Sequence, residues 1–280
     1  MCRAAADRLR DGGKSADHAL WDSEMVRISK LVNHLLKSRT GYEVKSAAYL
    51  ENFEFSRHLA KLFRLCDIRC VLDVGANDGD YAEWLRREVG YQGLVVSFEP
   101  VRELVEQLRA KARHDPKWIV LDFALGSSNT RSQINVMQGH TFSSFLTPDH
   151  SSVTEFGDKN VVKHVEEVEV RTLDSVIGML RERHQVDNLY LKIDTQGFDL
   201  EVVRGAAGTL PEILALQTEV AMRTIYREMP TIHDTLTELG AQGFDVTGLF
   251  PVVRDPLLRV VEFDCVMINS RLAANAANGK

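Results

Sequence analysis

The chain has 280 residues, which is enough for one large domain or two small ones, because domains average about 150 residues. Its composition, with 44% hydrophobic and 26% charged residues, is typical of a globular protein with a sizeable core. Lys and Arg number 34 against 40 Asp and Glu, and the net charge of −6 argues against sequence-independent binding to nucleic acid. No apolar run is long enough for a membrane span, and the charged first residues do not resemble a signal peptide. The four cysteines contain no CxxC pair, so a cytoplasmic protein with reduced thiols is expected.

Residues 1–65 come before any predicted strand. Apolar residues at spacings of three and four predict one helix from Met25 to near Gly41 and a second helix over 47–65. We expect this segment to form a helical cap on the domain that follows. The first 23 residues and the tail 271–280 are expected to be poorly ordered, because both are polar and rich in small residues.

From Cys70 onward, short apolar runs alternate with helical patterns. The predicted strands are 70–75, 94–100, 118–126, 188–194, 213–220, 244–250 and 260–269. The predicted helices are 81–88, 102–113, 174–184, 200–204 and 231–239. Apolar runs separated by helices indicate a parallel sheet in a doubly wound α/β fold. The last two runs are joined without a helix, so they should pair antiparallel at one end of the sheet. One domain over 66–270 with seven main strands is therefore predicted.

The segment 127–170 interrupts this alternation. Clusters of Ser, Thr, Asn and Gly surround two stretches of alternating polarity, 133–137 (QINVM) and 165–173 (VEEVEVRTL). We interpret the segment as a loop-rich insertion that carries edge strands and overhangs the ligand crevice.

The most informative local motif is DVGANDGDY (73–81), directly after the first predicted strand. Gly75 and Gly79 allow a tight turn and a close approach of backbone to ligand at the carboxyl end of the sheet. The dinucleotide fingerprint GxGxxG is absent, because its middle glycine is replaced by Asn77. Asp78 and Asp80 would repel a pyrophosphate, so the loop suits a cofactor with an amine or sulfonium charge. The alternative is that the glycines only form a strand-to-helix turn.

Acidic residues stand at the ends of the following strands. Glu99, about 20 residues after the glycine loop, is placed to hold ribose hydroxyls. Asp122 and Phe123 could bracket an adenine, although Phe123 suits the core equally well. Asp194 could be a general base, an acceptor-orienting group or a ligand of the cofactor's amine, or simply an N-cap. Glu219 has the same ambiguity, and the pair lacks a convincing third ligand, so no bound metal is predicted.

Among the nine histidines, His140 is the best candidate for a base, because it lies in the loop GHTFSS (139–144) of the insertion. A plain surface position is the alternative for this residue. No HxxxH pair indicates zinc, and no GxSxG elbow indicates an α/β-hydrolase.

Taken together, these segments resemble the FkbM family of S-adenosylmethionine-dependent methyltransferases over residues 70–270. The resemblance rests on DVGANDGDY (73–81), SFEP (97–100), FALG (123–126), TFSSFL (141–146), VRTLDSV (170–176), LKIDTQGFDLEVVRGA (191–206) and QTEV (217–220). One departure is Thr195-Gln196, where the family commonly has an acidic residue before the glycine.

The resemblance implies a class I, Rossmann-like methyltransferase fold, and together with the strand pattern this predicts a seven-stranded, mostly parallel sheet with an antiparallel last strand and helices on both faces. The expected N-terminal helical cap, residues 1–65, is not covered by the family motifs. The resemblance also implies S-adenosylmethionine as cofactor, with its methionine end lined by Asp73, Gly75, Asn77, Gly79 and Tyr81. Glu99 would hold the ribose, and Asp122, Phe123 and Ala124 would lie near the adenine. Asp194 would lie close to the transferred methyl group, with Ser143 and Ser144 closing over it. Asp194 or His140 would act as catalytic base, with Glu219 facing the substrate.

Members of this family typically methylate hydroxyl groups of sugars, glycolipids, polyketides or related secondary metabolites. We therefore expect an O-methyltransferase with a small-molecule acceptor, no nucleic-acid partner and no transmembrane segment, and we leave a homodimer open. Three alternatives remain: a nicotinamide-dependent oxidoreductase, a methyltransferase-like scaffold without turnover, and an N-methyltransferase of a small amine or peptide. Carboxylates and aromatic side chains around the pocket would favour the last of these.

Overall fold

The structure is a computed structural model that describes residues 39–40, 47–151 and 156–271. The chain divides into two units, residues 1–57 and residues 58–280. Helix α3 (Ala47–Leu65) matches the second predicted helix and continues from the first unit into the second. Most of the helix predicted from Met25, the first 23 residues and the tail from residue 272 lie outside the described residues.

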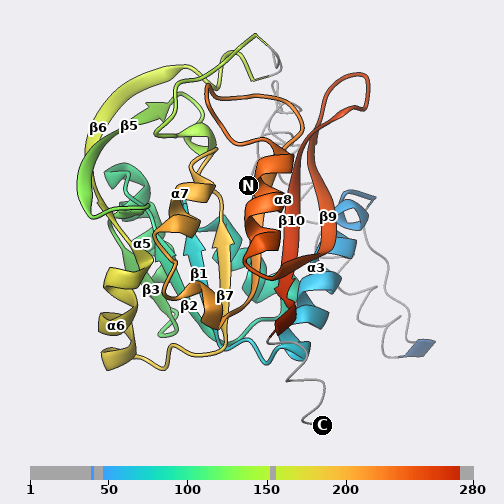
Figure 1. Cartoon of the computed structure of the whole chain (residues 1–280). Helices are drawn as coiled ribbons and strands as arrows, with labels where there is room; N and C mark the ends of the chain where they lie inside the picture. Colours follow the sequence, from blue (N-terminus) through green and yellow to red (C-terminus); the bar gives the residue numbers. More distant parts are fainter. Residues whose placement is uncertain (1–38, 41–46, 152–155, 272–280) are drawn as a thin grey trace, which may run out of the picture. The chain divides into compact units, whose positions relative to one another are not determined.

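A seven-stranded sheet forms the centre of the second unit, in the order β3-β2-β1-β7-β8-β10-β9 (Figure 1). Its strands are β1 (Cys70–Val74), β2 (Leu94–Phe98), β3 (Trp118–Leu121), β7 (Leu189–Ile193), β8 (Ile213–Ala221), β9 (Phe244–Arg254) and β10 (Val260–Asn269). The five strands β3, β2, β1, β7 and β8 are parallel to one another, whereas β10 runs antiparallel to both of its neighbours, β8 and β9. The expected fold class, a Rossmann-like class I sheet with an antiparallel last strand, is confirmed. Its strand order reverses between β1 and β7, the place where such sheets bind ligands.

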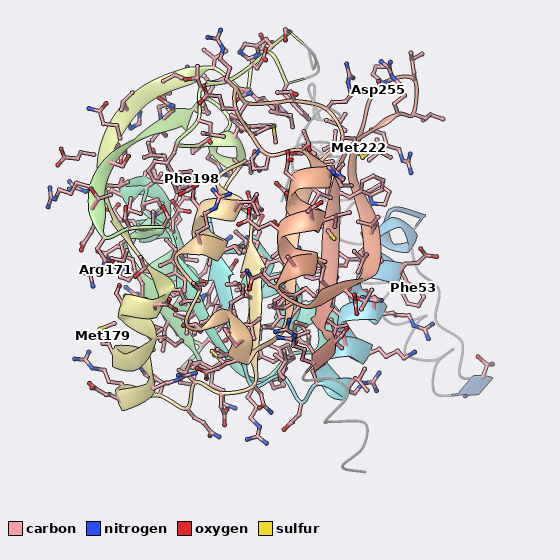
Figure 2. The ribbon with its side chains drawn as sticks, in the orientation of Figure 1. Phe53, Arg171, Met179, Phe198, Met222 and Asp255 are labelled. Carbon is pink, nitrogen blue, oxygen red and sulfur yellow. The ribbon has the colours of Figure 1, made fainter. Side chains whose placement is uncertain are left out.

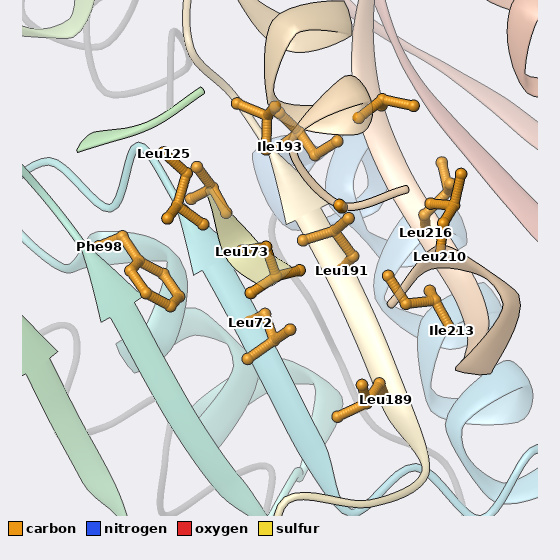
Figure 3. Packing of buried hydrophobic residues seen from close by; sticks show 14 of the residues in the cluster. Leu72, Phe98, Leu125, Leu173, Leu189, Leu191, Ile193, Leu210, Ile213 and Leu216 are labelled. Atoms are coloured by element: carbon orange, nitrogen blue, oxygen red, sulfur yellow. The ribbon is translucent and has the colours of Figure 1, made fainter. Parts of the chain in front are cut away.

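Helices cover both faces of this sheet. Helices α6 (Leu173–Arg183), α7 (Asp199–Arg204) and α8 (Ile232–Ala241) lie on one face, over a continuous apolar core (Figures 1 and 3). That core includes Leu72, Leu191 and Leu216 from three adjacent strands. Helices α4 (Asp80–Trp84) and α5 (Arg102–Ala112) connect β1 to β2 and β2 to β3. The predicted helix 81–88 begins as α4 and continues as a π-helical turn over Leu85–Val89.

The predicted strand 118–126 is wrong in its second half. Leu121 pairs with Phe98, the last residue of β2, so the main sheet offers no partner beyond this point. The chain instead forms β4 (Ala124–Leu125), which pairs with β6 (Val162–Arg171) in a second sheet of order β4-β6-β5. Strand β5 (Thr130–Met137) pairs antiparallel with β6, so the two stretches of the insertion are not edges of the main sheet. Among the described residues, no helix is long and apolar enough to cross a membrane.

Candidate functional site

The glycine turn after β1 lies directly against the end of β7. Gly75 has a φ of 72°, and a Cβ atom at this position would lie 1.9 Å from the carbonyl oxygen of Asp194. The amide of Asp194 donates to the carbonyl of Val74 at 3.1 Å, so the two strand ends are joined by a hydrogen bond. Only glycine allows this combination of left-handed backbone and close approach.

Gly75→Ala is therefore expected to destabilise the protein by roughly 2 kcal/mol or more, because the new methyl group meets backbone and the φ value disfavours alanine. Thermal and urea unfolding would measure the change. Gly178 in α6 is the matched control, because a Cβ atom there meets nothing within 4 Å. Gly178→Ala should leave stability unchanged or raise it by about 0.5–1 kcal/mol. Equal effects of the two substitutions would contradict the role of the Gly75 turn.

Glu99 follows the last residue of β2 and holds the glycine loop through a hydrogen bond to the backbone of Asn77. Its side chain is 4% exposed, and its two carboxylate oxygens accept the amides of Asn77 at 2.8 Å and Val101 at 2.9 Å. Burial raises the pKa of Glu99 to about 7, although both backbone hydrogen bonds oppose this shift. Each carboxylate oxygen keeps a second lone pair, so Glu99 can still accept hydroxyl groups from a ligand.

A buried ammonium group joins the ends of β1 and β7. Lys192 is 1% exposed, and its Nζ lies 3.1 Å from Oδ1 of Asp73 and 3.5 Å from Oδ2 of Asp194. It also donates to the carbonyl of Gly75 at 3.1 Å. Burial lowers the pKa of Lys192, but the two carboxylates outweigh this effect and raise it overall. Burial likewise raises the pKa of Asp194, but the charge of Lys192 prevails and the net shift is downward. Asp194 is thus a buried carboxylate that stays ionised.

Gln196 links this carboxylate to the next strand. Its Nε2 donates to Oδ1 of Asp194 at 3.1 Å and to Oε2 of Glu219 at 2.7 Å. Burial and the nearby charge of Asp194 raise the pKa of Glu219 well above its ordinary value. The pKa values of the two carboxyl groups are therefore shifted in opposite directions, that of Asp194 downward and that of Glu219 upward. A pair of this kind can supply one base and one hydrogen-bond donor.

The insertion is fastened over these strand ends. The side-chain amide of Asn77 donates to the carbonyl of His140 at 2.9 Å, and its oxygen lies 2.6 Å from Nδ1 of His140. Because an amide oxygen only accepts, Nδ1 of His140 is the donor in this contact, and Nε2 is left for another partner. The hydroxyl of Ser144 donates to the carbonyl of Gln196 at 2.7 Å. The Tyr226 hydroxyl lies 2.8 Å from the carbonyl of Phe142 and 2.8 Å from Oε1 of Gln196.

Other predicted site residues occupy different surroundings. The hydroxyl of Tyr81 is buried and donates to Gln217 at 2.8 Å. Asp122 is exposed and forms a surface ion pair with Arg109 at 3.1 Å. The ring of Phe123 packs on Phe98 and lies under the guanidinium of Arg171, which Figure 2 labels.

The remaining predicted residues lie in a turn, in a strand and in the insertion. Gly79 precedes α4 with a φ of 91°, and Ala124 is buried in β4. The hydroxyl of Ser143 accepts the amide of Met137 at 3.3 Å within the insertion. The structure thus gathers Asp73, Gly75, Asn77, Glu99, His140, Ser144, Asp194 and Glu219 around the ends of β1, β2, β7 and β8.

Sequence reasoning did not assign a role to four buried residues of this region. Lys192 and Gln196 lie inside the LKIDTQGFD motif, so the sequence places them near the end of a strand. It does not predict their partners, Asp73 and Asp194. Tyr226 lies in the loop after β8, and Glu262 lies on β10, where no motif marks them. Within the described residues, no group of three His, Cys, Asp or Glu side chains is arranged to hold a metal ion.

A family model described as "Methyltransferase FkbM domain" matches residues 73–246, more than half of the chain. A comparison with curated proteins gave no match.

Among solved structures, fibrillarin of Aeropyrum pernix, with natively bound S-adenosyl-L-methionine, is 12% identical. Its match covers 72% of this chain and 66% of that chain, with a TM-score of 0.39. An rRNA methylase of Streptococcus thermophilus is 10% identical over 81% of this chain and 99% of its own, with a TM-score of 0.42. Magnesium protoporphyrin IX methyltransferase of Synechocystis, with bound SAM, is 11% identical over 86% and 97% of the two chains, with a TM-score of 0.36. Likenesses this distant carry no information on ligand or substrate.

The sheet order and the glycine turn at the β1/β7 switch point define a Rossmann-like protein of the class I methyltransferase fold. Within that class, the chain belongs to the FkbM methyltransferase family, as its sequence motifs indicated.

Proposed function

We propose that this protein transfers a methyl group from S-adenosylmethionine to a hydroxyl group of a small molecule. The observation that carries the proposal is the buried carboxyl group of Asp194, which lies 3.5 Å from Nζ of Lys192 and directly against the glycine turn. Membership in the methyltransferase family supports the reaction class. The hydroxyl acceptor is a sugar, a glycolipid or a polyketide-type metabolite, as the family resemblance implies.

The donor would lie across the ends of β1 and β2. The residues present fit it, because the turn at Gly75 exposes backbone without a side chain and Glu99 has free lone pairs for two ribose hydroxyls. When bound, S-adenosylmethionine supplies an electrophilic methyl group on a sulfonium. Asn77 and Asp73 would line its methionine end, and Ala124 and Phe123 would lie toward the adenine.

Asp194 would accept the proton of the acceptor hydroxyl while the new carbon–oxygen bond forms. General bases of this kind contribute about 10²- to 10⁴-fold to the rate. Much of the remaining acceleration would come from holding oxygen, methyl carbon and sulfur in line. The insertion, held by Asn77, Gln196 and Tyr226, would cover the site and exclude water. His140 remains the second candidate base, through its Nε2.

Calorimetric titration with S-adenosylhomocysteine tests the donor site, with NAD as control. We expect one-site binding of S-adenosylhomocysteine and none of NAD. Glu99→Ala should weaken the binding about 10-fold or more, because it removes two hydrogen bonds to the ribose, each worth about 0.5–1.5 kcal/mol, or about 1.5–3 kcal/mol when the carboxyl group is ionised. Binding of NAD would favour an oxidoreductase. If neither NAD nor S-adenosylhomocysteine binds, a methyltransferase-like scaffold without turnover is favoured.

The Glu99 carboxyl group also accepts the amide of Asn77, so Glu99→Ala could weaken donor binding by changing the conformation of the glycine loop. This effect must be distinguished from the loss of a hydrogen bond to the ribose. Glu99→Gln keeps the size of the side chain and one accepting oxygen, and should give an intermediate affinity. Circular dichroism and thermal unfolding of each variant would report any loss of fold. Unchanged affinity in a folded Glu99→Ala variant would refute the ribose assignment.

A further inference from the structure

The hairpin formed by β9 and β10 carries two exposed leucines where the chain turns. Leu257 and Leu258 are each 73% exposed, the highest values among the large apolar side chains that the structure describes. They lie in the segment 254–259 (RDPLLR), called the hairpin tip below. A single exposed apolar residue needs no explanation, but an adjacent pair this exposed can mark an interaction site.

The backbone of Leu258 is also unusual for a leucine. Its φ is 63°, in the left-handed region that glycine and asparagine adopt far more readily. The turn is closed on both sides of this residue, because its amide donates to the carbonyl of Asp255 at 2.9 Å and its carbonyl accepts from Arg254 at 2.9 Å. Neither burial nor backbone preference therefore accounts for a leucine at this position. Residues held in such conformations cluster at functional sites.

The side chain of Asp255 holds the hairpin tip in this shape. It is buried, and its Oδ1 accepts the amides of Leu257 and Arg259 at 2.9 Å each. Its Oδ2 accepts from Nε of Arg259 at 2.6 Å and lies 3.3 Å from a guanidinium nitrogen of Arg223, which follows β8. These contacts order the turn before any partner arrives, so little entropy is lost when the two leucines are buried by one.

The surroundings of the leucines are basic. Arg254 and Arg259 stand on either side of them in the sequence and are exposed, whereas the acidic residue of the tip, Asp255, is buried. Met222 adds a half-exposed apolar side chain near the base of the hairpin, where its amide donates to the carbonyl of Val261 at 2.8 Å (Figure 2). The outer surface of the tip thus combines apolar side chains with positive charge, on a chain whose net charge is −6.

This combination matches the surface of an anionic bilayer. Leucines are favourable in the acyl region just below the headgroups, and guanidinium groups pair with lipid phosphates above it. A protein partner fits less well, because a standard interface buries about 800 Å² on each side. A projecting tip of six residues is narrow for that purpose, whereas a bilayer takes up protruding side chains without a matching groove.

The hairpin tip lies at the same edge of the sheet as the candidate site. Glu262, three residues after the tip, pairs with Ala221, the last residue of β8, so the hairpin extends past the carboxyl end of the parallel strands. Figure 1 shows it rising beyond that end, toward which the arrows of β1 and β7 point. Gly75 and Asp194 follow the last residues of β1 and β7. A surface that the tip contacts is therefore approached by the edge of the sheet that carries the site.

We propose that the hairpin tip docks this protein on an anionic phospholipid surface, with Leu257 and Leu258 in the acyl region and Arg254 and Arg259 on lipid phosphates. With so few contacts, the docking is reversible and sensitive to salt. The docking itself does not depend on the proposed function. Combined with that function, it narrows the acceptor to the glycolipid, which a docked enzyme takes from the same surface.

Cosedimentation of the full chain with lipid vesicles tests the docking. One set of vesicles contains phosphatidylglycerol and phosphatidylcholine in equal parts, and the other contains phosphatidylcholine alone. We expect about 10-fold stronger binding to the mixed vesicles, because two arginines meet anionic phosphates there. Raising the salt from about 0.1 M to about 1 M, which shortens the Debye length from about 10 Å to about 3 Å, should remove most of this difference. Equal binding to both sets, or no binding to the mixed vesicles, would overturn the proposal.

Leu258→Asn separates docking from the shape of the turn. Asparagine tolerates the left-handed backbone, so the melting temperature should stay the same or rise. Binding to the mixed vesicles should nevertheless fall about 10-fold or more, because one inserted leucine is lost. Leu257→Ser is a second variant with the same expected loss. Leu65→Asn is the matched control, since Leu65 is 57% exposed beside an arginine at the end of α3, before the start of β1, and it should bind as the wild type does. Undiminished vesicle binding by both folded tip variants would refute the docking.

Two further measurements on the same samples separate the other outcomes. Light scattering reports the oligomeric state. A dimer that Leu258→Asn dissociates, in a protein that does not bind vesicles, would make the tip an interface between copies and overturn the proposal. Calorimetry with S-adenosylhomocysteine should give the tip variants the affinity of the wild type, because the tip contributes no residue to the donor site. Lack of donor binding by the wild type would refute the proposed function and leave the vesicle result standing.

Discussion

Lys192→Met is expected to lower the free energy of unfolding by about 3–5 kcal/mol, the usual cost of removing one partner from a buried ion pair. The substitution leaves two carboxylates, Asp73 and Asp194, buried without the ammonium that lies 3.1 and 3.5 Å away from them. It also removes the donor to the carbonyl of Gly75, so the glycine turn loses a contact. Urea unfolding at pH 7, followed by circular dichroism, would measure the loss.

Lys163→Met is the matched control for charge and length. Lys163 lies 3.6 Å from Glu103 with both side chains at least half exposed, so its loss should change stability by less than about 1 kcal/mol. The double variant Lys192→Met with Asp73→Asn removes one of the stranded charges and should recover part of the lost stability. If Lys192→Met costs no more than Lys163→Met, the buried ammonium is not what holds the strand ends together.

Asp194→Asn is expected to lower turnover about 10²- to 10⁴-fold, because the amide cannot take the proton of the acceptor hydroxyl. The affinity for S-adenosylhomocysteine should change less than three-fold if Asp194 acts on the acceptor. Methyl transfer to a hydroxyl acceptor found by screening, together with donor calorimetry, would separate the two effects. Lys192 holds the pKa of Asp194 below its ordinary value, so the rate of the wild type should not fall between pH 8 and pH 5 through protonation of this group.

Two further variants and the donor affinity decide between Asp194 as general base and the alternative roles. Glu106→Gln should keep full turnover, because this side chain is exposed on α5 and is not among the residues gathered around the strand ends. His140→Gln tests the second candidate base and should lower turnover less than Asp194→Asn does. A large loss of donor affinity with little loss of turnover would instead make Asp194 a ligand of the donor's amine, the alternative that its position at the strand end left open.

The parts of the site that could be predicted lie within short, local segments. Gly75 and Asp194 stand at the ends of apolar runs, and strand ends meet at one edge of a parallel sheet. The close approach of Gly75 to the carbonyl of Asp194 explains why glycine stands there, although the distance of 1.9 Å depends on two strands about 120 residues apart in sequence. Glu99 was predicted from its spacing alone, but its role as an anchor for Asn77 was not.

The second sheet shows where local patterning stops being informative. Residues 118–126 form one apolar run, yet the strand divides after Leu121, because its partner β2 ends at Phe98. Ala124–Leu125 then pair with β6, about 45 residues farther along the chain. Periodicity indicates whether a segment is extended, whereas the partner of each strand depends on which neighbour still has unpaired backbone groups.

The amino-acid sequence by itself determined the strand-and-helix alternation, the glycine turn, the acidic strand ends and the methyltransferase family, since each of these is written in local periodicity or in contiguous motifs. The tertiary structure alone decided the charged and polar surroundings of each carboxyl group. Asp194 follows the last residue of β7 and Glu262 lies in β10, but only Asp194 has Lys192 beside it, whereas Glu262 has an oxygen without a hydrogen-bond partner. Ionisation in a protein interior depends on burial and on the few charges within several ångströms. Those neighbours come from strands far apart in the chain and become visible only when the sheet is assembled.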